Sequence, residues 1–328
     1  MSGSGTRPRA RGATPRRLCF VRIVSLLPSA TEIVFALGLG DDLVGVTHEC
    51  DYPPEARGKP VVTRAVHDLV GASSQQVHAL VEDSMRTHQA LYELDEAALE
   101  AAHPDLILTQ ELCRVCAVGY EEVNEAARRL DGEVTVLSLE PVSIEGILNT
   151  IQTVGAMTEA EDAAIDVVED LRERLRHVNE IVAGRRDNGF LPPRVAAVEW
   201  LDPPFAVGHW VPEQVRIAGG WELLGAEGGR SVPTTWDAVR EVDPEILVLM
   251  PCGFDLPRTV EEWGRLPRPD GWDTLKAVQS GRVFATDGSA YFSRPGPRVI
   301  DGIELLAELV DPAAFDGMSP DGSWERVG

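Results

Sequence analysis

Short apolar, β-branched runs alternate with segments of helical periodicity from residue 22 onward. After the first run, Ser29 can cap a helix with Glu32 three residues later and Gly38 at the end. Strands separated by helix-length segments are typical of βαβ units, so the pattern predicts a parallel sheet. The strands predicted in the first half of the chain are residues 22–26, 43–47, 60–62, 106–109 and 134–138.

The longest strand-free stretch, residues 144–184, predicts a helical connection. Apolar residues recur there at helical spacing, and Gly184 marks the end. A second alternating pattern follows, with strands predicted at 194–200, 246–250 and 282–286 and a last helix at 299–310. We therefore predict an α/β protein with two Rossmann-like lobes, each built on a parallel sheet, joined by one long helix.

These patterns predict five parts along the chain. Residues 1–21 are expected to be a disordered basic tail, because a polar and basic segment cannot bury a core. An N-terminal α/β lobe follows at 22–143, with a helical insertion at 66–98. Residues 144–184 contain the linker helix, 185–312 form a C-terminal α/β lobe, and 313–328 are a tail.

The charge balance narrows the classes of partner. With 53 acidic and 30 basic residues, the 328-residue chain carries a formal net charge of -23. Such a protein repels nucleic acid and anionic membrane surfaces, so a small molecule is the expected partner. No segment reaches the roughly 18 to 20 uncharged apolar residues of a membrane span, so we expect no membrane insertion. We also expect a monomer.

The cysteines and the N-terminus bear on location. Five cysteines form an odd count in a large chain, which favours a reducing compartment over a disulfide framework. The pair Arg16-Arg17 has the form of a twin-arginine signal, but the apolar stretch that should follow is broken by Arg22, Pro28 and Glu32. We therefore expect a cytoplasmic protein; the alternative is export through a degenerate twin-arginine signal.

The loops that follow the predicted strands indicate where a ligand would bind, since ligands of open parallel sheets lie beyond the carboxyl ends of the strands. These loops carry an unusual concentration of cysteine, histidine and aromatic residues. They include residues 27–29, 48–53 and 111–116 in the first lobe and 202–210, 251–254 and 290–294 in the second. The cleft between the two lobes is therefore the predicted site.

A metal site is one reading of these loops. Cys113 and Cys116 form a CxxC, which is typical of half a zinc site, a redox couple or two small buried thiols. Loops beyond other strands add further thiol and imidazole groups. A thiolate-bound zinc or iron ion would then use Cys50, Cys113, Cys116, Cys252, His48 and His209 as candidate ligands. Structural thiols remain the alternative, because the second CxxC of a zinc signature is absent.

Seven segments in order carry a resemblance to a known family. They are LLPSATEIVFALGL (26–39), VGVTHECDYPP (44–54), HPDLIL (103–108), DPPFAVG (202–208), IAGGWELL (217–224), DPEILVL (243–249) and YFSRPGPRVI (291–300). From about residue 22 to 310 the chain resembles the cobalamin-binding branch of the periplasmic-type solute-binding proteins of ABC importers, as an unexported variant. The resemblance implies two lobes joined by a helix and a corrinoid held between them.

The resemblance also implies site residues. Positions matching the family's ligand-lining pattern are Pro28, Tyr52, Phe205, Tyr291, Phe292 and Arg294. Aromatic faces pack on a large ring, and an arginine binds its amide or phosphate edge. Trp210 joins this ligand wall because it follows a predicted strand beside glycine and proline residues.

Three positions depart from the family pattern. Ala290 stands where an aspartate is expected, a tryptophan of the second lobe falls near Thr234 and Thr235, and residues 66–98 replace a ligand-contacting stretch. The resemblance further implies docking to an importer permease through one exposed acidic residue on each lobe. Asp237 matches one of these positions, and Glu96 is adjacent to the other.

Two hypotheses follow for function. The first is binding, without catalysis, of cobalamin or a related corrinoid or metal chelate by a solute-binding protein of an ABC importer. The second is a cytoplasmic metal-thiolate protein or metalloenzyme on the same fold. No Gly-rich phosphate loop, GxSxG or HExxH motif occurs in the chain, so binding is favoured over catalysis.

Overall fold

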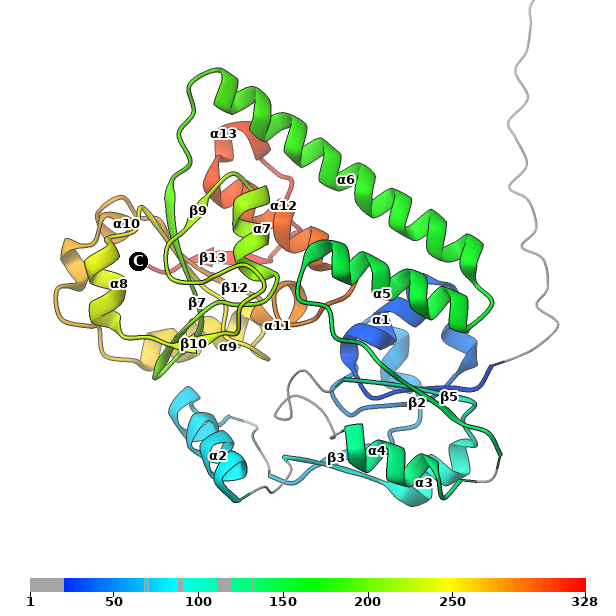
Figure 1. The fold of residues 1–328 in the computed structure, drawn as a ribbon. Helices are drawn as coiled ribbons and strands as arrows, with labels where there is room; N and C mark the ends of the chain where they lie inside the picture. Colours follow the sequence, from blue (N-terminus) through cyan, green and yellow to red (C-terminus); the bar gives the residue numbers. More distant parts are fainter. Residues whose placement is uncertain (1–20, 68, 70, 88–90, 111–119, 131) are drawn as a thin grey trace, which may run out of the picture.

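The computed structural model describes residues 21–328 apart from 68, 70, 88–90, 111–119 and 131. Figure 1 shows two α/β lobes, with helix α6 (Glu161–Asp187) running across both of them. The predicted fold class, two α/β lobes with a helical connection, is confirmed. Within the described ranges, no helix combines the length and apolar character needed to cross a membrane.

The first lobe is built on a four-stranded parallel sheet in the order β2-β1-β5-β6. Its central strands are buried on both faces, which explains their uninterrupted apolar sequences. The predicted strand at 60–62 is wrong: Val61 makes only an isolated bridge with Val46. The sheet strands are β1 (Ile23–Ser25), β2 (Leu43–Val46), β5 (Leu106–Thr109) and β6 (Thr135–Ser138), accompanied by α1 (Pro28–Ala36), α3 (Glu96–Ala102) and α4 (Tyr120–Ala127).

The region predicted as a helical insertion contains a helix between two short strands. Strands β3 (Thr63–Ala65) and β4 (Tyr92–Leu94) pair antiparallel, and α2 (Ser74–Thr87) lies between them in sequence. Ser73 and Gln76 form a reciprocal cap at the start of α2, with each side chain accepting from the other residue's backbone N–H. This S-x-x-Q pattern sets the start of the helix.

The second lobe has a mixed sheet in the order β10-β8-β7-β11-β12-β13, with β9 beside β7. The predicted strands β7, β11 and β12 pair in parallel, whereas β8, β10 and β13, which the pattern did not predict, run antiparallel to their neighbours. The strands are β7 (Arg194–Leu201), β8 (Pro204–Ala206), β9 (Trp221–Glu222), β10 (Val232–Pro233), β11 (Ile246–Leu249), β12 (Val283–Thr286) and β13 (Trp324–Arg326). The helices are α7 (Val211–Ile217), α8 (Trp236–Val242), α9 (Leu256–Arg265), α10 (Lys276–Gln279), α11 (Gly288–Tyr291), α12 (Val299–Val310) and α13 (Pro312–Phe315).

The segment expected to be a C-terminal tail is part of this lobe. β13 pairs with β12, and the Trp324 ring packs edge-on against Phe284 with 5.3 Å between centroids. Phe315 is buried in the core as well. These apolar side chains give the last residues enough buried surface to order them.

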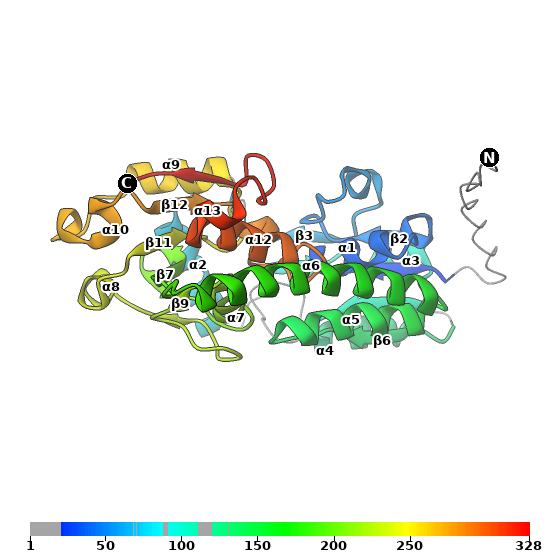
Figure 2. The same cartoon turned by 90° about the horizontal axis from the view of Figure 1, so that it is seen from above.

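The predicted helical segment contains two helices, and the second of them, α6, is the long helix that runs along both lobes. α5 (Ile144–Met157) ends at Thr158, and α6 begins at Glu161 and lies against α5. A Cβ on Gly155 would lie 2.5 Å from the Cβ of Ala164, so glycine allows the close approach of the two helices. Figure 2 shows α6 extending beside both lobes.

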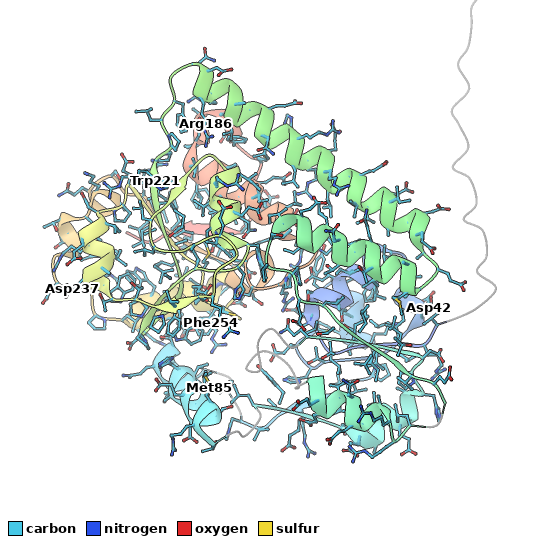
Figure 3. The ribbon with its side chains drawn as sticks, viewed as in Figure 1. Asp42, Met85, Arg186, Trp221, Asp237 and Phe254 are labelled. Atoms are coloured by element: carbon cyan, nitrogen blue, oxygen red, sulfur yellow. The ribbon has the colours of Figure 1, made fainter. Side chains whose placement is uncertain are left out.

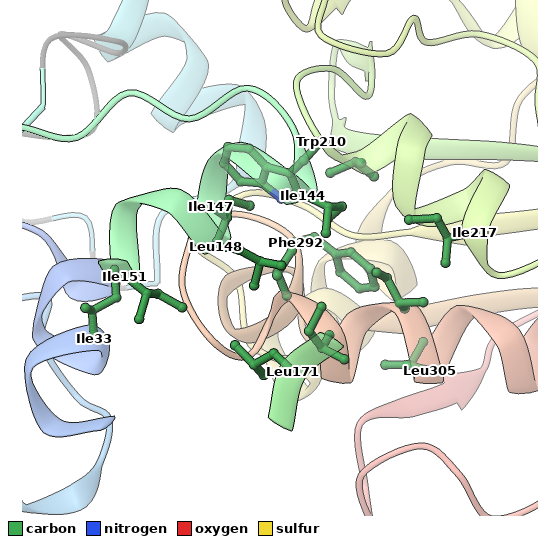
Figure 4. Close-up of a cluster of buried hydrophobic side chains, with 14 of the residues drawn as sticks. Ile33, Ile144, Ile147, Leu148, Ile151, Leu171, Trp210, Ile217, Phe292 and Leu305 are labelled. Atoms are coloured by element: carbon green, nitrogen blue, oxygen red, sulfur yellow. The ribbon is translucent and has the colours of Figure 1, made fainter. Parts of the chain in front are cut away.

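One hydrophobic core continues from the first lobe through α5 into the second. Ile33 of α1, Ile151 of α5 and Leu305 of α12 belong to it. Figure 4 shows the α5 side chains between those of the two lobes. Burial of this apolar surface fixes the lobes to each other along the side of the molecule that carries α5 and α6.

An ion network reinforces the same junction. Glu32 of α1 is 3% exposed, and its carboxylate accepts hydrogen bonds from Arg298 at 2.6 and 3.0 Å. Arg294 donates to the Glu32 carboxylate at 3.4 Å and to Asp51 at 2.5 Å. Both arginines belong to the second lobe and both carboxylates to the first, so the network joins the lobes.

We expect Glu32→Ala to lower the free energy of unfolding by about 3–5 kcal/mol, because it leaves the largely buried Arg298 guanidinium without the carboxylate to which it donates. Glu145→Ala is the control, since Glu145 pairs with Arg172 on the exposed surface, where a pair contributes about 1 kcal/mol or less. Urea denaturation of both variants measures the difference. Equal, small losses would contradict a structural role for Glu32.

Candidate functional site

A cavity of about 390 Å³ lies between the two lobes. Described residues from both lobes line it, and most of them follow strands β1, β2, β5, β7, β11 and β12 at their carboxyl ends. The lining is mainly apolar, with a few hydroxyl, amide and carboxylate groups. Such a composition is typical of small-molecule sites.

Aromatic rings form much of the wall contributed by the second lobe. Trp200, at the end of β7, packs edge-on against Phe254 with 5.2 Å between centroids. Phe205 of β8 packs against His78 of α2 at 5.6 Å. These contacts hold the rings in place before a ligand arrives, which limits the entropy lost on binding.

The predicted ligand-binding residues lie in different parts of the structure. Pro28, Phe205 and Arg294 line the cavity. Tyr52 is 44% exposed and lines a separate hollow of about 680 Å³ between α1, α6 and the start of α12. Tyr291 is absent from the described lining of the cavity and lies beside Arg298, 5.9 Å from its guanidinium.

Trp210 and Phe292 are core residues, which corrects their assignment to the ligand wall. They are 6% and 3% exposed and belong to the core around α5. Figure 4 shows both rings among the α5 isoleucines and leucines. The reason is that α7 and α12 both lie in the junction between the lobes, so aromatics near their starts fill this core.

Several lining residues were missed by sequence reasoning. Val77, His78 and Val81 come from the insertion helix α2, and Tyr92 comes from β4. The helical spacing of Val77 and Val81 was the available signal for one apolar face, but nothing in the sequence indicates that this face points across to the other lobe.

Arg294 reaches the cavity with its charge already neutralised. Its guanidinium donates to Asp51 at 2.5 Å, to Glu32 at 3.4 Å and to the backbone oxygen of Glu49 at 3.4 Å. Among the lining residues that the structure describes, it is the only arginine or lysine. The cavity therefore offers no unpaired positive charge from these residues.

Two carboxyl groups line the same cavity. Burial raises the pKa of Glu199 to about 7, so this side chain is mostly protonated below neutral pH. The hydrogen bond with His48 holds the pKa of Glu49 below its usual range. The protonated Glu199 carboxyl can therefore donate a hydrogen bond to a ligand, whereas the ionised Glu49 carboxylate accepts one.

The described metal-ligand candidates do not come together. Cys50 is buried in the first lobe, where its sulfur lies 3.0 Å from the Thr31 hydroxyl, and burial raises the pKa of this thiol to about 11. Cys252 lines the cavity beyond β11. Across the described ranges, no group of three or more His, Cys, Asp or Glu residues could hold a metal ion.

The two candidate histidines have other roles. His48 Nδ1 lies 2.8 Å from the Thr63 hydroxyl. The His209 backbone bonds to Gly228 and Gly229, and its ring packs beside Trp210. Cys113 and Cys116 lie outside the described residues. The metal-thiolate hypothesis therefore has no support from the residues that are described.

Comparison with known proteins identifies the family. The family described as periplasmic binding protein matches residues 23–290. The chain belongs to this family. It is a periplasmic-type solute-binding protein of ABC import, and the members of this family are solute-binding proteins rather than enzymes.

Relatives of this periplasmic binding protein are similar over most of their length. An uncharacterised ABC transporter substrate-binding lipoprotein of Bacillus subtilis is 26% identical over 300 residues, covering 90% of this chain and 81% of the relative. The vitamin B12-binding protein of Vibrio cholerae is 24% identical over 296 residues, covering 87% of each chain.

Solved structures share the fold. The periplasmic vitamin B12 binding protein of Vibrio cholerae has a TM-score of 0.64 at 21% identity, over 89% of this chain and 97% of that one. A periplasmic heme binding protein of Pseudomonas aeruginosa has a TM-score of 0.66 at 21% identity, over 89% and 93%.

The expectation of a cytoplasmic location is wrong. The family is that of periplasmic binding proteins, and the relatives are periplasmic proteins or lipoproteins of ABC importers, which work outside the cytoplasm. The odd cysteine count misled the inference, because it argues against a disulfide framework without excluding export. The Arg16-Arg17 pair lies outside the described residues.

We expect Glu199→Gln to change how stability depends on pH. The folded protein keeps the Glu199 proton up to about pH 7, whereas the unfolded chain releases it near the ordinary pKa of 4.5. The stabilisation is therefore full below that value and is lost as pH rises toward 7. Relative to the variant, the wild type should lose free energy of unfolding across this window.

Urea unfolding at several pH values tests this expectation. Glu100→Gln, on the exposed face of α3, is the matched control and should follow the wild-type curve. Parallel curves for the wild type and Glu199→Gln would contradict the raised pKa of Glu199.

Proposed function

We propose that the protein binds cobalamin or a related corrinoid in the cavity between its lobes and acts as a monomer that delivers it to an ABC importer. Relatives of known specificity are named for vitamin B12, although structural neighbours also include heme-binding proteins. The choice between these ligands rests on the charge of the cavity.

The charge balance of the lining carries the proposal. The rim of a heme ends in propionate carboxylates, whereas the rim of a corrinoid is rich in neutral amides. Among the described lining residues, Arg294 is the only arginine or lysine and is already paired with Asp51, while Glu49 adds a negative charge. Propionates would meet repulsion without a counter-ion, which favours the amide-rich ligand.

Polar groups of the lining suit amide side chains. Gln110, Ser289 and Ser293 can each donate and accept hydrogen bonds, and protonated Glu199 supplies a further donor. Phe205, Trp200 and Pro28 offer apolar surfaces for the face of a macrocycle. The cavity thus combines a flat apolar contact with neutral hydrogen-bonding groups at the edge.

Isothermal titration of the protein with cyanocobalamin and, separately, with hemin tests the ligand. We expect cyanocobalamin to bind more tightly than hemin. Phe205→Ala should weaken cyanocobalamin binding about tenfold or more, as expected for a buried aromatic contact. Phe190→Ala is the matched control, because Phe190 packs under Arg185 at the end of α6, away from the cavity. Tighter binding of hemin would refute the choice of a corrinoid.

Importer docking is assigned to Glu96 and Asp237. Glu96 lies in the first turn of α3, Asp237 in the first turn of α8, and both side chains are mostly exposed. Each pairs with one arginine of its own lobe, Arg129 or Arg240. Figure 3 places Asp237 on the outer side of the second lobe, where a permease could reach it.

Charge reversal tests this docking role. Asp237→Arg should reduce cobalamin uptake by cells that carry the variant in place of the wild-type protein, because it replaces an attraction with a repulsion at the interface. Binding of cyanocobalamin by the purified variant should stay unchanged. Glu180→Arg, on exposed α6, is the control for net charge. Normal uptake with Asp237→Arg would exclude this residue from docking.

A further inference from the structure

Helix α2 belongs to the first lobe in sequence but lies against the second. It is connected on both sides to the β3–β4 pair. Figures 1 and 2 both place it beside the elements of the second lobe, next to β10 and α9 in Figure 1, and away from α3 and α4. The helix thus crosses the cleft on the side opposite α5 and α6.

A single carboxylate of the second lobe holds the start of α2. Glu262 Oε1 on α9 accepts a hydrogen bond from the Ser74 backbone N–H at 2.7 Å and another from the Ser74 hydroxyl at 2.5 Å. Ser74 is fully buried and Glu262 is 3% exposed. The negative charge sits at the helix N-terminus, where the backbone dipole favours it.

Arg258 adds a second contact between the same elements. Its guanidinium donates to the backbone oxygen of Ala72 at 3.1 Å and lies 3.7 Å from the centroid of the Phe254 ring. Arg258 and Glu262 are four residues apart on α9, so they share one face of that helix. We call these contacts of Arg258 and Glu262 with Ala72 and Ser74 the latch.

The inner face of α2 opens onto the cavity. Val77, His78 and Val81 line it, and all three are only half-buried. Ser74, which the latch holds, is the one residue of α2 that is buried. A ligand in the cavity would cover the apolar face that the protein leaves partly open.

We propose that α2 is a detachable wall of the ligand cavity, held shut by the latch, and that it opens to admit the ligand and closes on it with Val77, His78 and Val81 as contacts. This inference rests on the proposed function for the nature of the ligand. The α5–α6 side is fixed by the Glu32 network and the continuous core, so movement that admits a ligand is expected at α2.

Hydrogen exchange in the ligand-free protein tests the latch by itself. Glu262→Ala should raise amide exchange in α2 about tenfold or more relative to the wild type, since it removes both hydrogen bonds to a charged acceptor. Ser74→Ala removes one of the two and should have a smaller effect. Glu261→Ala is the matched control, because Glu261 pairs with Arg265 on the exposed face of α9.

Stopped-flow binding of cyanocobalamin tests the gate. We expect dissociation from Glu262→Ala to be about tenfold faster than from the wild type, with Glu261→Ala unchanged. Val81→Asp should weaken binding while leaving exchange outside α2 unaltered, because it places a charge on the wall that covers the ligand.

The outcomes separate the two proposals. Exchange in α2 that is unaffected by Glu262→Ala, or raised equally throughout the chain, would overturn the latch whatever the ligand. Faster α2 exchange with unchanged cyanocobalamin kinetics would overturn the gate. A wild-type protein that binds no cyanocobalamin would overturn the proposed function, and the exchange data would still decide whether Glu262 holds α2.

Discussion

The carboxylate of Glu32 is the contact on which the arrangement of the two lobes depends. This carboxylate projects from α1 of the first lobe and accepts hydrogen bonds from Arg298 and Arg294 of the second lobe. The Glu32 side chain is almost fully buried. Buried charges of this kind are costly unless every partner is present, so the network tolerates one relative placement of the lobes. The core around α5 surrounds it and adds the apolar burial that the charges do not supply.

Because one side of the molecule is fixed, the carboxyl ends of both sheets face the same cavity. Arg294 shows how closely structure and site are joined: the guanidinium that helps to tie the lobes also forms part of the cavity wall. The positive charge of Arg294 is neutralised by the carboxylates of Asp51 and Glu32. The other described lining residues offer apolar surface, neutral polar groups and carboxyl groups. The opposite side of the cleft is spanned by α2 through a few polar contacts. The two sides therefore differ in the strength of their attachment.

Some of the residues predicted for the site line the cavity and others are buried in the core, and packing explains the difference. Pro28 follows β1, Phe205 lies within β8, and Arg294 follows the short helix α11 beyond β12; all three line the cavity. Trp210 and Phe292 also come after strands. The helices that follow them, α7 and α12, pack in the junction between the lobes, so their rings lie in the core. Cys50 follows β2 yet turns inward to the Thr31 hydroxyl. Position after a strand locates a loop, whereas the direction of each side chain depends on what packs behind it.

The sequence by itself determined the fold class and the alternation of strands and helices in the two lobes, because hydrophobic periodicity is a local property of the chain. Only the tertiary structure decided which aromatic residues are wall and which are core, that the described candidate ligands form no metal-binding group of three or more, and that the last strand belongs to the second sheet. It also decided that α2 leaves its own lobe to meet Glu262, 188 residues away in the chain. Such contacts join segments with no local relation in sequence, so no pattern within either segment encodes them.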